Sequence, residues 1–450
     1  MRAIILKPAI LLACLALAAG AHAAQKAFPY AYSQEDLPNG LRLITIPTDY
    51  PNIVALYIVV QTGSRNEVEA GKTGFAHLFE HMMFRGTEKF PPDKYQAALT
   101  AAGAASNAYT TDDHTAYHTV FSKEDLEQIL AMEADRFQNL KYTQAVFKTE
   151  TQAVLGEYNK NSANPMSKLF EALRDTAFDR HTYKHTTMGF LKDIQDMPNQ
   201  YDYSLQFFDR YYRPEYATIL VVGDVTRERL RPLVDKYWSN WKRGAYKPAV
   251  PSEPEQNGPR ANQVAWPTST LPMVLVAYRA PAYTDIERES AALDVLAALG
   301  FSQNSDLYQK LVIQQQTVDT LFGGAEDRVD PYLFTVLARV KKPADVGAVQ
   351  EEILSTIKKL AAEPAPAARL ETVKQNLRYS FALSMSNSEA IAAIVARYVA
   401  LRRTPETINR IYDMYAQVTP EDVQRVARQY LTESRRTIVT LASQAGGKKQ

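Results

Sequence analysis

Short apolar runs alternate with longer amphipathic stretches along most of the chain, in two rounds of similar order. In the first round, runs of branched apolar side chains predict strands at 41–46, 53–60, 106–111, 115–121 and 217–222. Apolar side chains at helical spacing predict helices at 75–84, at 95–102, through much of 123–162, and from the cap Thr226 towards Trp238. The first part of the chain therefore mixes both kinds of element.

A proline-rich segment separates the two rounds. Residues 246–260, YKPAVPSEPEQNGPR, hold four prolines, which continue neither a helix nor a central strand, so this segment predicts a linker. The second round then predicts, in order, a strand at 273–278, a helix at 290–299, a helix from Ser305, a strand at 332–340, long helices and a closing strand at 437–441. This order indicates a diverged duplication.

We therefore expect an α+β fold of two homologous halves, each a mainly antiparallel mixed sheet with helices packed on it. The halves span 24–245 and 261–443, and residues 444–450 form a tail. The chain has 450 residues and a formal net charge of only +1, without long blocks of like charge. A strong electrostatic attraction to nucleic acid or to an anionic membrane is therefore not expected.

The first 23 residues have the pattern of a secretory signal peptide. Arg2 and Lys7 precede an apolar run at 9–19, and a small-residue cleavage site ends at Ala23. The run is shorter than the roughly 20 residues that span a bilayer. We expect a periplasmic or secreted protein with no transmembrane segment after cleavage, and a lipoprotein acylated at Cys14 is the alternative.

Cys14 is the only cysteine in the chain, so the mature protein would have none. This excludes thiol nucleophiles, disulfides and cysteine-bound zinc, and any metal site must use His, Asp and Glu.

The stretch HLFEH places His77 and His81 four residues apart in a predicted helix, with Glu80 directly before the second histidine. Side chains at this spacing lie on one helix face about 5–6 Å apart, so both rings can bind one ion. A catalytic zinc site needs three protein ligands. The best third donor is Glu157, which shares a helix face with Glu150, and Glu150 could orient one histidine by a hydrogen bond. The alternative is a core helix with satisfied polar groups and two solvated glutamates.

Two further pairs of histidines have the same spacing. His114 and His118 lie in or beside a predicted strand, where four residues span about 13 Å, so we interpret them as structural or substrate-facing. His181 and His185 lie in a polar, turn-like stretch, where a loop beside the site is possible. Neither pair has a carboxylate placed for acid–base chemistry.

Three stretches together resemble a known family. HLFEHMMFRGTEKFP at 77–91, SNAYTTDDHTAY at 106–117 and ETQAVLGEYNKN at 150–161 resemble the pitrilysin and insulinase-type inverted zinc metallopeptidases, which include insulin-degrading enzyme and mitochondrial processing peptidase. The resemblance covers nearly the whole mature chain. It implies a clam-shell arrangement of the two halves and zinc-dependent hydrolysis of peptide bonds.

The resemblance also implies roles for the site residues. His77, His81 and Glu157 would bind one Zn²⁺ per chain, and Glu80 would be the general base that takes a proton from the attacking water. Glu150 matches the family's supporting glutamate. The matching helix of the second half has no ligand set, so only the first half would hold metal.

Residues Asn107, Ala108 and Tyr109 match the family's edge strand, on which an extended peptide is bound as an added strand. The alternative is an ordinary edge strand.

The chain departs from the family in its second half. In the resembled family an Arg and a Tyr stabilise the oxyanion, and the resemblance places them at the positions of Val312 and Asp319. Neither Val312 nor Asp319 can donate the hydrogen bonds that the Arg and the Tyr would supply. We expect a homologous partner chain to supply both residues, as in a heterodimer with zinc on one subunit. The alternative is a catalytically weak or inactive subunit that binds peptides or serves assembly.

Overall fold

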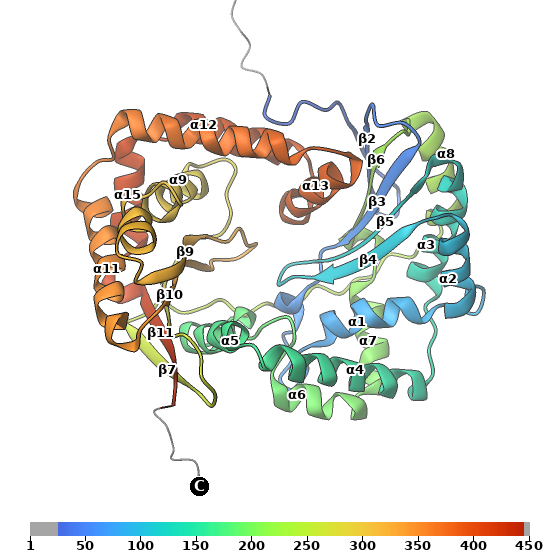
Figure 1. Ribbon diagram of the computed structural model, residues 1–450. Helices are drawn as coiled ribbons and strands as arrows, with labels where there is room; N and C mark the ends of the chain where they lie inside the picture. The colour runs from blue at the N-terminus through green and yellow to red at the C-terminus, as the bar shows by residue number, and fades with distance from the viewer. Residues whose placement is uncertain (1–25, 445–450) are drawn as a thin grey trace, which may run out of the picture.

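The computed structural model describes residues 26–444 and contains two mixed sheets, one in each half of the molecule (Figure 1). The predicted signal peptide, Cys14 and nearly all of the predicted tail lie outside the described residues and stay predictions. No helix among residues 26–444 has both the length and the apolar character needed to cross a membrane.

The two sheets have the same plan. Within the described part of the chain, the first sheet has the order β1 (Ser33–Asp36), β2 (Arg42–Pro47), β6 (Ala217–Gly223), β3 (Ile53–Val60), β5 (Thr115–Ser122) and β4 (Ala105–Thr110). The second has the order β7 (Arg260–Trp266), β11 (Arg436–Ser443), β8 (Met273–Arg279), β10 (Leu333–Val340) and β9 (Val318–Ala325). Each sheet is antiparallel except for one parallel pair, β2 with β6 and β7 with β11. The predicted fold of two homologous α+β halves is confirmed.

Most of the helices cover the outer faces of the sheets, and one helix of each half instead lies between the two sheets (Figure 1). Those of the first half are α1 (Phe75–Met82), α2 (Pro92–Ala101), α3 (Leu126–Asn139), α4 (Gln144–Ser162), α5 (Pro165–Ala177), α6 (Leu191–Asp196), α7 (Tyr201–Tyr211) and α8 (Arg227–Trp238). Those of the second half are α9 (Glu289–Phe301), α10 (Asp306–Tyr308), α11 (Val346–Ala362), α12 (Ala367–Ser384), α13 (Ser388–Arg402), α14 (Glu406–Gln417) and α15 (Pro420–Tyr430).

Several predicted elements differ in detail from the structure. The helices predicted within 123–162 are α3 and α4, with the break between them where α3 ends at Asn139 and the side chain of Thr143 caps α4. The helix expected from Ser305 has its cap there, but only three α-helical residues follow before a π-helical turn at Gln309–Gln314. Strands β1, β7 and β9 were not predicted, since each has partly exposed positions instead of a continuous apolar run.

The halves exchange one helix each. Helix α13 of the second half packs on β3 and β6 of the first sheet, and α5 of the first half packs on β7 and β11 of the second (Figure 1). The apolar side chains of these helices share cores with the sheets they cover, as the buried residues Ile391, Val395, Leu169 and Leu173 illustrate. Each half therefore packs one helix on the sheet of the other half, which holds the two halves together.

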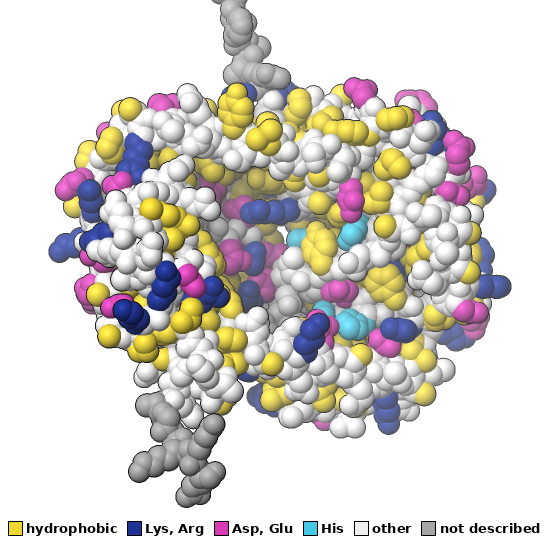
Figure 2. Space-filling view, viewed as in Figure 1, with side chains coloured by type: hydrophobic (Ala, Val, Ile, Leu, Met, Phe, Trp, Pro, Cys, Tyr) yellow, Lys and Arg dark blue, Asp and Glu magenta, His cyan; other side chains and the backbone are white. Residues whose placement is uncertain are grey.

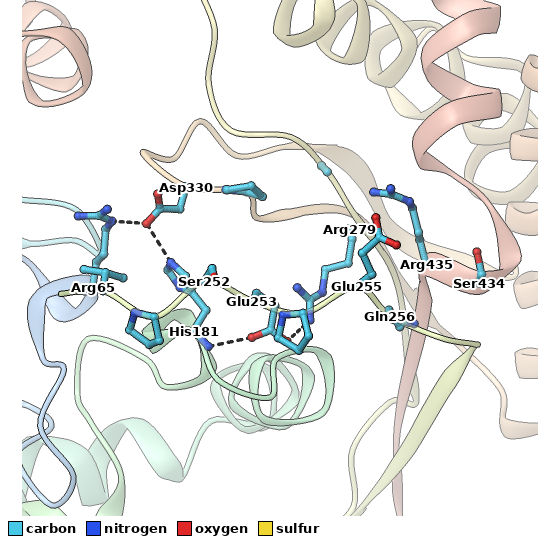
Figure 3. A pocket seen from close by; sticks show the side chains of 15 residues that line it. Arg65, His181, Ser252, Glu253, Glu255, Gln256, Arg279, Asp330, Ser434 and Arg435 are labelled. Carbon is cyan, nitrogen blue, oxygen red and sulfur yellow. Dashed lines mark hydrogen bonds and ion pairs between the residues drawn. The ribbon is translucent and has the colours of Figure 1, made fainter.

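The proline-rich segment is tied to both halves. Glu253 accepts hydrogen bonds from the backbone N–H groups of Asp179, Arg180 and His181 at 2.8 to 2.9 Å, and from the guanidinium of Arg279 at 2.7 Å (Figure 3). Residues 241–259 form no helix or strand. The boundaries at 246 and 260 stay predictions.

Candidate metal centre

Helix α1 begins at a sharp turn that fixes the direction of the HLFEH segment. Gly74 has a φ of +92°, and a Cβ atom there would lie 2.8 Å from the carbonyl oxygen of Met188. The buried carboxylate of Glu67 accepts hydrogen bonds from the backbone N–H groups of Gly74 and Ala76, at 2.8 and 2.7 Å. The first N–H groups of a helix have no partner inside it, so Glu67 satisfies two donors at the start of α1.

The side chains of α1 divide between the core and the site. The apolar ones are buried in the core of the first half: Phe75, Ala76, Leu78, Phe79 and Met82. Helix α1 packs against α4, and the ring centroids of His77 and His81 lie 4.9 Å apart. Among the residues that the structure describes, one group of three potential ligands has all its ligand atoms within 4.8 Å of one another, and it consists of His77, His81 and Glu157.

The distances between these atoms fit a zinc ion. The Nε2 atoms of His77 and His81 lie 3.6 and 3.5 Å from Oε2 of Glu157. Two ligands at about 2.0–2.2 Å from a tetrahedral zinc ion lie about 3.4 Å apart, close to both distances. Two imidazoles and one carboxylate are also a donor set that catalytic zinc uses. The residues present therefore fit one zinc ion.

The surroundings of the two histidines differ. Burial lowers the pKa of His77, the neighbouring His81 lowers it further and Glu157 raises it, to a final value of about 4. His77 is therefore neutral at pH 7, as a metal ligand must be. The pKa of His81 is raised, chiefly by its interaction with Glu150, while burial opposes that shift.

Strand β4 holds the carboxylate of Glu80. The hydroxyl of Thr110 donates a hydrogen bond of 2.7 Å to Oε2 of Glu80. Burial raises the pKa of Glu80, whereas the bond from Thr110 and a positive charge on His81 lower it. A carboxylate with a raised pKa beside a metal site is suited to general acid–base chemistry.

An arginine fixes Glu150 beside the site. Oε2 of Glu150 lies 3.7 Å from Nδ1 of His81, and its Oε1 lies 2.9 Å from Nε of Arg85. Glu150 thus connects His81 to Arg85. Sequence reasoning missed both Arg85 and Thr110. Arg85 follows His81 by four residues and so had a spacing signal, whereas the contact of Thr110 joins two elements distant in sequence.

Residues Asn107, Ala108 and Tyr109 lie on β4, the last strand of the first sheet. Within residues 26–444, β4 pairs only with β5, so its outer edge is open. Figure 2 shows that this face of the molecule is hollowed between the halves and that histidine side chains lie on the wall of the first half. An open edge beside Glu80 is where an extended peptide could add as a strand. That role stays a prediction.

The other histidine pairs do not form metal sites in the described residues. His114 is buried at the tip of the β4–β5 hairpin, where burial, and then nearby arginines, lower its pKa to about 3. His118 stacks on a tyrosine of β3. His181 bonds to Asp330 of the second half at 2.9 Å, and His185 is buried with a backbone carbonyl 3.0 Å away.

The second half has no counterpart of this site. Residues 292–296 of α9 are apolar and buried except for Asp294. Val312 lies in the π-helical turn, and Asp319 on β9 accepts a hydrogen bond of 2.8 Å from Arg339 of β10. Both positions lack the donors that a complete site of the resembled family has.

Comparison with known proteins agrees with the geometry. Residues 42–190 match the family model described as "Insulinase (Peptidase family M16)", and residues 200–377 match "Peptidase M16 inactive domain". The chain is 28% identical over 412 residues to "Zinc protease PqqE" of Helicobacter pylori, which covers 90% of this chain and 91% of that protein.

Two further relatives span the same region. The chain is 25% identical over 410 residues to "Probable mitochondrial-processing peptidase subunit beta" of Schizosaccharomyces pombe, with 88% of each chain covered. The crystal structure of a protease from Helicobacter pylori superposes with a TM-score of 0.85 and 27% identity over 92% of this chain and 99% of that chain. These matches confirm the resemblance and the clam-shell fold. The relatives of the chain include a zinc protease. The chain belongs to the insulinase family, peptidase family M16.

Proposed function

We propose that the chain is the zinc-bearing subunit of an endopeptidase that hydrolyses short or unfolded peptides outside the cytoplasm. The observation that carries this proposal is the convergence of His77, His81 and Glu157 within 4.8 Å, with Glu80 one residue before His81. The names of the relatives support a zinc protease, and that of the Schizosaccharomyces pombe protein describes a subunit.

His77, His81 and Glu157 would hold one zinc ion per chain. When bound, zinc would polarise a peptide carbonyl and make a nearby water more acidic. Glu80 would take a proton from the attacking water and deliver it to the nitrogen of the leaving amine. Glu150 would orient His81 and would itself be oriented by Arg85.

The peptide would bind along the open edge of β4, at Asn107, Ala108 and Tyr109. Backbone hydrogen bonds to an added strand give affinity with little demand on sequence. Enclosure between the halves and a partner chain would then select substrates by size, because a bulky folded protein would not fit into the enclosed space.

The second half of the chain does not supply an oxyanion donor at Val312 or Asp319, since the first is apolar and the second is ion-paired with Arg339. A homologous partner chain that carries an Arg and a Tyr at these positions would complete the site. The export expected from residues 1–23 would put the complex in the periplasm or outside the cell.

The test is a peptidase assay of the zinc-loaded chain alone, with a homologous Arg/Tyr-bearing chain, and with that partner after its Arg and Tyr are changed to Val and Asp. The unaltered partner should raise kcat by about 10²–10³-fold over the other two samples, as expected for restored oxyanion donors. Full activity of the chain alone would contradict partner dependence. If zinc is bound and no sample cleaves peptides, the inactive assembly subunit is the correct interpretation.

A further inference from the structure

The β4–β5 hairpin joins the proposed general base to the interface between the halves. Thr110 is the last residue of β4, and its hydroxyl donates a hydrogen bond to the carboxylate of Glu80. The turn that follows, residues 111–114, is closed by a backbone hydrogen bond of 2.8 Å from Thr111 to His114. The position of this turn therefore determines where Thr110 lies.

The first half fixes one side of the turn through its backbone. The N–H of Arg65 donates to the carbonyl oxygen of Asp112 at 2.8 Å, and the N–H of Ser64 donates to that of Thr111 at 3.3 Å. A Cβ atom at Gly63 would lie 2.3 Å from the carbonyl oxygen of Thr111, so this approach requires glycine.

Asp112 connects the turn to the second half. Its buried carboxylate forms a bidentate ion pair with Arg174 of α5, at 2.7 and 3.0 Å. Nε of Arg328, in the segment between β9 and β10, donates to Oδ2 of Asp112 at 3.0 Å. Burial alone would raise the pKa of Asp112, but Arg174 and Arg328 hold it well below its usual value. Asp112 is therefore charged at neutral pH.

The neighbouring Asp113 makes a second connection. Its Oδ2 accepts a 3.0 Å hydrogen bond from the backbone N–H of Val329, and its Oδ1 accepts one of 2.6 Å from the hydroxyl of Tyr183. Both acidic residues of the turn thus bond directly to consecutive residues of the second half, Arg328 and Val329.

We propose that Thr110 and Arg328 are positioning residues: Arg328 fixes the hairpin turn through Asp112, and Thr110 transmits that position to the carboxylate of Glu80. This inference rests on the proposed role of Glu80 as general base. It gives the metal-free half a part in catalysis within its own chain, separate from any Arg/Tyr pair supplied by a partner. Because kcat depends steeply on the placement of an acid–base group, loosening the turn should slow turnover without changing the ligands of the metal.

The experiment compares Thr110→Val, Thr110→Ser, Arg328→Gln and the double variant Thr110→Val/Arg328→Gln in the peptide-hydrolysing preparation. Arg42→Gln is the matched control: Arg42 also bonds across the halves, to the carbonyl oxygen of Arg403, and its side chain is 20% exposed against 19% for Arg328, but it does not touch the hairpin. Zinc content, KM and kcat are measured for each.

We expect Thr110→Val and Arg328→Gln each to lower kcat by about 10–100-fold, with zinc content and KM unchanged. Thr110→Ser, which keeps the hydroxyl, and Arg42→Gln should stay within about twofold of the wild type. The double variant should be no slower than the slower single variant, because both changes break one connection. If Arg328→Gln does not fold, Arg328→Lys replaces it, since lysine keeps the positive charge but lacks the Nε–H that donates to Asp112.

Multiplied effects in the double variant, or wild-type kcat in both single variants, would overturn the coupling. An equal loss in Arg42→Gln would also overturn it, because the effect would then be general to the interface. The proposed function is tested separately by Glu80→Gln: activity in that variant contradicts the base itself, whereas an inactive Glu80→Gln with an unaffected Thr110→Val contradicts only the positioning role.

Discussion

The two halves share a strand order, but the first helix after β3 and the first helix after β8 differ in the side chains on one face. In the first half, α1 turns its apolar side chains to the core and its two histidines to α4. In the second half, α9 packs against α12, α14 and α15, and residues 292, 293, 295 and 296 are all buried and apolar. The fold therefore does not need the polar face. The proposed metal site replaces a packing surface that the second half retains.

The edge strands β4 and β9 of the two sheets differ as well. Strands β4 and β9 occupy the same edge position in their sheets. β4 ends at Thr110, which holds Glu80, whereas β9 is followed by the segment whose Arg328 bonds back to the first half. The β4 edge is the proposed substrate strand, and a residue that follows β9 bonds to the turn that follows β4.

The largest expected effect comes from changing Glu157, a proposed zinc ligand of the first half. Glu157→Gln keeps the size of the side chain but removes its charge, so we expect loss of zinc and of all measurable hydrolysis. Metal analysis and a peptide assay check this. Glu352→Gln in the second half is the control, because its side chain is 36% exposed against 39% for Glu157. Retention of zinc in Glu157→Gln would contradict the assignment of Glu157 as a zinc ligand of the first half.

A reciprocal exchange tests whether the two helix faces are as different as described. Leu296→His places an unpartnered polar ring in the core of the second half and should lower the free energy of unfolding by about 2–5 kcal/mol. His81→Leu, at the matching position of α1, should abolish zinc binding but change the free energy of unfolding of the metal-free protein by only about 1 kcal/mol or less. Urea unfolding with a chelator present measures both. Equal destabilisation by the two changes would contradict the account.

A smaller effect is expected from the residues that support the ligands. Glu150→Gln should weaken zinc binding by about 10–100-fold, because His81 loses the charged group that orients it. Arg85→Met should act in the same direction and less strongly, since Arg85 contacts Glu150 but not the histidine. Competition with a chelator of known affinity measures both. Unchanged affinity in Glu150→Gln would exclude a supporting role.

The weakest predicted effect concerns pH and the interface between the halves. Burial raises the pKa of Glu253, but its bonds to backbone N–H groups and to Arg279 lower it from 4.5 to about 2. Asp330, bonded to His181 and Arg65, likewise has a pKa lowered from 3.8 to about 2, against the effect of burial. A lowered folded-state pKa stabilises the protein above the unfolded-state value, so this contribution is complete above about pH 4.5 and lost as the pH falls towards 2.

Unfolding curves of the wild type and Glu253→Gln between pH 7 and pH 2 check this. The variant should be less stable at pH 7, and the difference should shrink steadily as the pH falls from about 4.5 towards 2, because Glu253 of the wild type is then protonated in the unfolded state and becomes half protonated in the folded state. A difference that is constant over this range would contradict the assignment.

Local patterns predicted much of the fold and of the proposed site. The buried strand β3 has the predicted bounds, because a continuous run of branched apolar side chains has few alternatives. His77, His81 and Glu157 could be selected from helical spacing and the family resemblance. Strands β7 and β9 could not be predicted, since their residues are partly exposed and form no continuous apolar run, and β7 also pairs with β11, which is distant in sequence.

The contacts between distant elements could not be predicted from the sequence either. The exchange of α5 and α13 between the sheets depends on how the halves pack. The bonds from Thr110 to Glu80 and from Arg328 to Asp112 join residues 30 and 216 positions apart, and no periodicity marks such pairs.

The most direct test of the account is the zinc content and kcat of Glu80→Gln in the preparation that hydrolyses peptides, whether the chain alone or the chain with its partner. We expect the variant to bind as much zinc as the wild type while kcat falls by about 10²–10⁴-fold, because the ligands remain and the general base is lost. A zinc-loaded variant that turns over peptides at the wild-type rate would contradict it.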